Sequence, residues 1–223
     1  LHIFMAGKVT WDIFFNELGV ITIGIGVALL INLYMPSVDK KLMDYVSEIE
    51  ENFKIIFCEM VNYLRTGDSN WAGKEITNSA RLLDEAITLA LQDVENHFLR
   101  DENAYFHYFK MREKQFEIIE RVLPIVTSFT RTIKQGHMVA EFLEELAENV
   151  HSGNTAHIYL EKLREMKKEF EEMELPKTRE EFETRAALLQ LVNEMNDYLI
   201  IKSTFKGIKS SPKVNEQKKI EAN

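Results

Sequence analysis

Apolar positions are spread unevenly along the chain, and the longest apolar run lies near its start. From Leu18 to Met35 the sequence reads LGVITIGIGVALLINLYM, with no charged residue and only Thr22 and Asn32 polar. A helix of this length extends about 27 Å, close to the ~30 Å hydrocarbon thickness of a bilayer. The pattern therefore predicts a transmembrane helix at about residues 18–35.

Two other structures have similar apolar runs, a buried core helix and the apolar region of a signal peptide. A signal peptide follows a basic segment and precedes a cleavage site, whereas Asp12 and Glu17 lie upstream here and no such site follows. A core helix this apolar is uncommon outside large proteins. The sequence favours the membrane interpretation. In this interpretation Glu17 and Asn32 face protein or a water-filled cavity, because exposing these polar side chains to lipid costs free energy. They would serve as helix–helix contacts or as part of a substrate pathway.

The start of the chain also bears on its extent. Residues 1–15 are apolar and aromatic and do not begin with Met. We expect the chain to be a fragment that lacks its upstream part.

Downstream of Pro36, apolar residues recur every three or four positions, which is typical of helices that bury one face. Turn-forming residues or prolines divide this region into six helical segments, with Gly136 closing the third. Thr178 and Glu181 form a capping-box pattern that opens the sixth. The predicted fold class is all-α: one transmembrane helix followed by an antiparallel bundle of about six long helices.

Charge separates the end of the chain from the bundle. The chain carries 27 Lys and Arg against 36 Asp and Glu, a net charge of −9, whereas residues 202–223 carry six Lys and two Glu. A basic polar end is typical of disorder, and the alternatives are contact with anionic lipid or with the acidic bundle. The predicted domains are the end of a membrane domain (1–36), a helical bundle (37–205) and a disordered basic tail (206–223).

Composition and motifs exclude several kinds of function. One cysteine rules out a disulfide framework, and the acidic balance argues against binding nucleic acid. No phosphate-binding loop, nucleophile elbow or zinc motif is present. Glu148-x-x-His151 has the spacing of metal ligands on one helical face, but di-iron bundles need two such motifs. His151 lies in the last turn of its predicted helix, where a cationic side chain complements the helix dipole. We expect no catalytic residue, metal or cofactor, and no enzymatic activity.

Arg112 is the strongest candidate for ligand binding. It falls on the aromatic face of the third predicted helix, and Tyr105, Tyr108 and Gln115 lie nearby. Such residues can hold a planar ring while the guanidinium pairs with a carboxylate. The alternative is an ion pair between Arg112 and a carboxylate of another helix.

Arg185 has the same two interpretations. We expect it on the inward side of the sixth helix, next to Phe182 and Leu189.

Three segments resemble a known family. They are residues 16–36 (NELGVITIGIGVALLINLYMP), 105–115 (YFHYFKMREKQ) and 183–199 (ETRAALLQLVNEMNDYL). The first resembles the last membrane helix of the aromatic acid exporter family of bacteria, and the others resemble that family's C-terminal helical domain. The resemblance implies several upstream membrane helices, a cytoplasmic helical domain and efflux of aromatic carboxylates.

The predicted function is that of the C-terminal part of a membrane exporter, whose bundle serves assembly, gating or ligand sensing. Lys40 and Lys41 follow the apolar segment, so the bundle is expected in the cytoplasm of a bacterial cell with the helix in the cell membrane. Expected partners are the lipid bilayer, upstream transmembrane helices, an aromatic carboxylate and further copies in a homo-oligomer. The alternative is a single-pass, membrane-anchored interaction scaffold, and the number of apolar segments upstream of Leu1 distinguishes the two.

Overall fold

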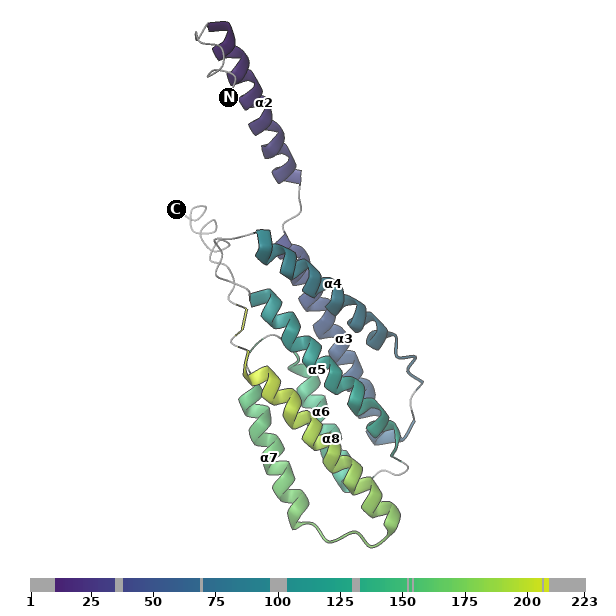
Figure 1. Cartoon of the computed structure of the whole chain (residues 1–223). Helices are drawn as coiled ribbons and strands as arrows, with labels where there is room; N and C mark the ends of the chain where they lie inside the picture. The colour runs from purple at the N-terminus through teal and green to yellow at the C-terminus, as the bar shows by residue number, and fades with distance from the viewer. Residues whose placement is uncertain are drawn as a thin grey trace, which may run out of the picture. The chain divides into compact units, whose positions relative to one another are not determined.

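The chain forms α-helices throughout the regions that the structure describes. The computed structural model describes residues 11–34, 38–68, 70–96, 104–129, 133–151, 153, 155–205 and 207–208. Within these ranges there are seven α-helices and no strand (Figure 1). The chain divides into two compact units, Leu1–Lys41 and Leu42–Asn223. The all-α prediction is confirmed for the described residues.

The first unit contains helix α2, Trp11–Tyr34. The Thr22 hydroxyl donates to the Leu18 carbonyl at 2.7 Å, which satisfies this polar group within the helix. Apolar side chains are exposed around the circumference of α2, including Val20, Ile21, Ile23, Ile25, Val27 and Leu29. No helix among the described residues combines the length and the apolar character of a membrane span. The segment predicted to cross the membrane is thus confirmed as a helix but not as a span.

Six helices follow α2 in the described part of the chain, as the apolar spacing predicted, and consecutive helices run antiparallel (Figure 1). They are α3 (Val38–Thr66), α4 (Lys74–Asn96), α5 (Ala104–Thr127), α6 (Lys134–Glu148), α7 (Ala156–Glu172) and α8 (Arg179–Ser203).

Helices α5 and α8 are central to the packing of this second unit. Helix α5 packs against α4 and α8, and α7 packs against α8 and α6. Helix α3 contacts α5 through stacked rings of Phe53 and Phe116, with centroids 6.0 Å apart, and contacts α8 through Phe57 and Tyr198 at 5.4 Å. All four rings are buried, and such pairs add about 0.5–1.5 kcal/mol beyond the burial of their area. These aromatic contacts join α3 to the two central helices.

Gly136 does not close the third bundle helix, and this expectation was wrong. Helix α5 ends earlier, at Thr127, and Gly136 lies in the first turn of α6. Pro124 within α5 lacks an N–H, and the Thr127 hydroxyl donates to the Leu123 and Pro124 carbonyls. Side chains that compete for backbone carbonyls weaken the last turn, so the helix stops three residues after the proline.

The capping box at the start of α8 is confirmed in one half. The Glu181 N–H donates to Thr178 Oγ1 at 3.1 Å, which satisfies an otherwise free donor of the first turn. The Glu181 carboxylate accepts from the N–H of Lys177 at 2.9 Å, one residue before the expected donor.

The buried face of the first half of α8 differs from the predicted one. Phe182 and Leu189 are 61% and 49% exposed, whereas Leu188 is buried. Apolar residues surround the first half of α8, so a spacing of three or four fits more than one face. The buried residues of the helix are Thr184, Leu188, Leu191, Val192, Met195, Tyr198, Leu199 and Lys202.

The predicted domain limits fall mostly outside the described residues. Residues 35–37 and 209–223 are not described, so the boundary at 36 and the disordered tail stay predictions.

Candidate functional site

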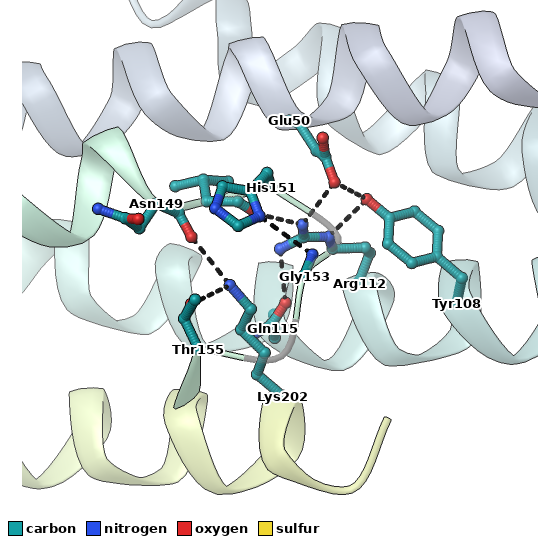
Figure 2. Close-up of polar contacts among 10 residues, drawn as sticks. Glu50, Tyr108, Arg112, Gln115, Asn149, His151, Gly153, Thr155 and Lys202 are labelled. Atoms are coloured by element: carbon teal, nitrogen blue, oxygen red, sulfur yellow. Dashed lines mark hydrogen bonds and ion pairs between the residues drawn. The ribbon is translucent and has the colours of Figure 1, made fainter. Parts of the chain in front are cut away.

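A fully buried arginine, Arg112 of α5, lies at the centre of a polar network in the bundle (Figure 2). Its Nη2 pairs with Oε1 of Glu50, a residue of α3, at 3.0 Å. The same nitrogen donates to the Val150 carbonyl, between α6 and α7. Its Nε donates to the Tyr108 hydroxyl at 2.9 Å, and Nη1 donates to Gln115 Oε1 at 3.0 Å. The guanidinium is therefore held by three separate parts of the bundle.

Helical spacing explains why Arg112 meets two of these partners. Tyr108 and Gln115 lie four residues before and three residues after Arg112, so all three share a face of α5. The Tyr108 hydroxyl also donates to Glu50 Oε1 at 2.7 Å. Rings of Tyr108 and Phe53 lie 5.1 and 5.6 Å from the guanidinium carbon, within the range of cation–π contacts.

The network continues into α8 through Gln115. Its Nε2 donates to the carbonyl of Tyr198 at 3.0 Å. The Tyr198 hydroxyl is buried and has no hydrogen-bond partner among the described residues. Burial raises the pKa of Tyr198 to about 12 and raises the pKa of Tyr108 well above its usual value. Both phenols therefore stay neutral at physiological pH.

A second buried cation, Lys202 of α8, lies in the same region (Figure 2). Its Nζ donates to the Asn149 carbonyl at 2.9 Å and to Thr155 Oγ1 at 3.4 Å. No carboxylate pairs with it in the described part of the chain. Burial, together with the nearby charge of Arg112, lowers the pKa of Lys202 to about 8, although Glu50 acts in the opposite sense.

The structure brings together three of the five residues expected to bind a ligand. Arg112, Tyr108 and Gln115 form the network, and the interhelical ion pair that was the alternative for Arg112 is present. Tyr105 is half-buried and stacks on Phe109 with centroids 6.5 Å apart, outside the network.

Ligand binding at Arg112 stays a prediction, and the geometry restricts it. The guanidinium is inaccessible to solvent, so a ligand carboxylate reaches it only if Glu50 or Gln115 moves away.

Arg185 lies apart from the network, in the first half of α8. Its Nη2 pairs with Glu181 and its Nη1 donates to the Glu174 carbonyl. It borders a separate cavity between α6, α7 and α8.

The remaining candidates do not form a site among the described residues. Glu17 is half-buried on α2, and Asn32 is part of α2 but its side chain lies outside the described residues. Their membrane role stays a prediction. Glu148 pairs with Lys54 at 3.1 Å, and His151 Nδ1 accepts from the Gly153 N–H at 3.1 Å. The described residues hold no group of three metal-ligating side chains.

Comparison with known proteins gives matches along both units. A family profile described as "Putative aromatic acid exporter C-terminal domain" matches residues 39–203. A second profile, described as "Aromatic acid exporter family member 1", matches residues 1–35.

A curated relative and a solved structure are similar to the chain. "Uncharacterized protein YqjA" of Bacillus subtilis (strain 168) is 59% identical over 210 residues, which are 94% of this chain. The chain spans 65% of that relative's length. The "Crystal structure of putative membrane protein from Clostridium difficile 630" matches with a TM-score of 0.66 and 20% identity. That match covers 74% of this chain and 96% of the solved chain, and at this identity it shows the fold alone.

Removing the carboxylate of Glu50 is expected to destabilise the protein strongly. The variant Glu50→Ala leaves Arg112 buried without its charged partner, and such changes cost about 3–5 kcal/mol. Urea denaturation of residues 1–223 in detergent, followed by circular dichroism, measures the loss in free energy of unfolding.

The matched control is Glu144→Ala, which removes the carboxylate that pairs with Arg65 at 2.7 Å, also between α3 and another helix. Both side chains of this pair are exposed, and exposed pairs contribute little. If both variants lose the same free energy of unfolding, the buried pair of Glu50 and Arg112 contributes no more than an exposed pair, which contradicts the expectation.

Lys202 is expected to make stability depend on pH. Its pKa in the folded protein, about 8, is below the ordinary value of 10.5, so at neutral pH the unfolded chain binds this proton more tightly. The contribution of Lys202 to the free energy of unfolding therefore increases as the pH rises above 8. Relative to Lys202→Met, the free energy of unfolding of the wild type should rise by roughly 1 kcal/mol between pH 7 and 9.

Chemical denaturation of both proteins across this pH range checks the expectation. Taking the difference between their free energies of unfolding removes the contributions of the other titrating groups, which both proteins share. Lys168→Met, at an exposed position of α7, is the control and should give a difference that stays flat. A flat difference for Lys202→Met as well would mean that this amine is not held as a buried cation.

Proposed function

The chain belongs to the aromatic acid exporter family, and on this basis we propose that it is the C-terminal part of a membrane exporter. Helix α2 lies in the cell membrane, and the bundle of α3 to α8 lies in the cytoplasm. The exposed apolar surface of α2 carries this proposal, because water disfavours such a surface on every side of a helix and lipid does not. Lys40 and Lys41, just after α2, support the cytoplasmic position of the bundle.

The bundle gates export in this proposal. Helix α3 begins four residues after α2 ends, so α3 is the bundle helix to which the apolar helix is covalently connected. The ion pair of Glu50 and Arg112 fastens α3 to α5, and the same arginine binds the carbonyl of Val150. A displacement of α3 would therefore be passed to the centre of the bundle rather than absorbed within α3.

The transported compounds are aromatic carboxylates, which the family description supports. The bundle performs no covalent chemistry and needs no cofactor. Further copies of the chain form a homo-oligomer, and upstream transmembrane helices complete the pathway.

Export is tested in bacterial cells that express the complete coding region, including whatever precedes Leu1. Cells loaded with radiolabelled benzoate should lose it faster when they express the protein than when they carry the empty vector. Glu50→Gln should slow this loss several-fold at an unchanged amount of membrane-inserted protein, because the neutral amide no longer compensates the charge of Arg112. Glu144→Gln is the control and should export at the wild-type rate.

Two outcomes would contradict parts of the proposal. If wild-type cells retain benzoate and a panel of other aromatic carboxylates as the empty-vector cells do, the exporter is excluded and the membrane-anchored scaffold is favoured. If the wild type exports and Glu50→Gln exports equally well, the gating role of the network is excluded.

A further inference from the structure

A cavity of about 430 Å³ lies between α6, α7 and α8, apart from the Arg112 network. Its volume falls within the range of pockets that hold small organic molecules. Its lining combines two cationic side chains, one amide, one carboxylate and two apolar side chains: Lys167, Arg185, Gln135, Glu171, Phe170 and Leu189.

Two cationic side chains at this cavity have hydrogen-bonding capacity that the protein leaves unused. Gln135 is 4% exposed and lines the cavity. The Nε of Arg185 is buried without a partner. Lys167 donates to the neutral amide oxygen of Asn193 at 2.9 Å and forms no ion pair within the described part of the chain. Buried donors are normally satisfied, so the unpaired Nε of Arg185 indicates a missing acceptor.

The apolar side of the cavity has the complementary feature. Leu189 is 49% exposed and Phe170 is half-buried, although both are large apolar residues. Leu189 lies four residues after Arg185 on α8, and Phe170 lies three residues after Lys167 on α7. Each helix therefore presents one cation and one apolar side chain to the same space. A ligand with a charged end and an apolar body matches this pairing.

The unpaired charge of Lys167 favours an anionic ligand at the cavity. Arg185 is already paired with Glu181, whereas Lys167 has no carboxylate partner in the described residues. Glu171 is exposed on α7 and lines the same cavity, so it opposes an anion. An anionic ligand thus gains mainly from Lys167, because Glu181 already balances the charge of Arg185, and Glu171 weakens its binding.

We propose that this cavity binds a small organic monocarboxylate whose apolar body is about the size of one ring. The carboxylate accepts hydrogen bonds from Lys167 and Gln135 near Arg185, and the body packs between Phe170 and Leu189. The inference rests on the proposed export function for its biological meaning, because it makes the cavity the place where the bundle senses the exported acid.

The direct test is fluorine NMR of 4-fluorobenzoate titrated with residues 1–223 in detergent, with protein-free micelles as the blank. Saturable binding is expected at millimolar or lower concentration. Lys167→Met should weaken binding about tenfold, and Glu171→Gln should strengthen it several-fold. Lys168→Met is the matched control, because it removes the same charge from the next, exposed position of α7, and it should leave binding unchanged.

Competition with unlabelled compounds tests each half of the proposed ligand. Benzoate should displace the probe, whereas acetate, which lacks the ring, and benzyl alcohol, which lacks the charge, should displace it far more weakly. The proposal is overturned if the wild type shows no saturable binding, if benzyl alcohol competes as well as benzoate, or if Lys167→Met and Lys168→Met behave alike. Each of these variants changes an exposed or half-buried side chain, so loss of the fold does not confuse the result.

The experiments distinguish a failure of the proposed carboxylate site from a failure of the proposed export function. Export from cells without binding to the purified chain leaves the exporter in place and removes this site. Binding without export keeps the site and removes the exporter.

Discussion

The buried charge of Arg112 is the constraint on which the packing of the bundle depends. A cation without solvent access is tolerated only when charged and polar partners replace its water. Glu50, Tyr108, Gln115 and the carbonyl of Val150 meet this demand from α3, α5 and the α6–α7 connection. An apolar core alone accepts small shifts between helices, whereas these directional contacts fix the position of α3 along α5. The aromatic rings around the guanidinium then pack against a group whose position these hydrogen bonds already fix.

Much of the fold was predictable because a helix that buries one face leaves a regular trace in the sequence. The six helices of the bundle followed from apolar spacing, and the start of α8 followed from the pairing of Thr178 with Glu181. The errors share a cause, which is that local signals do not report tertiary contacts. Gly136 is typical of a helix end, yet Pro124 and the hydroxyl of Thr127 had already ended α5. The first half of α8 is apolar on several sides, so only packing selects its buried face.

The candidate site was predictable on α5 and not elsewhere. Arg112 stood out because a charge on an apolar face requires partners, and the helical period alone places Tyr108 and Gln115 beside it. Glu50 carried no comparable signal, since α3 has several acidic residues near that position and only the packing of α3 on α5 selects one. Lys202 was missed because it opens a lysine-rich end that is typical of a solvated tail, whereas the last turn of α8 buries it.

Helix α8 links the two polar regions of the bundle. Its first half carries Arg185 and Leu189 at the cavity, and its second half carries Tyr198 and Lys202 at the Arg112 network. A helix transmits displacement along its length because its backbone hydrogen bonds resist stretching. If a ligand in the cavity displaces α8, the carbonyl of Tyr198 moves with the helix, and Gln115 contacts that carbonyl directly. Sensing at the cavity and gating through α3 would then be two ends of one chain of contacts, from α8 through Gln115 and Arg112 to α3.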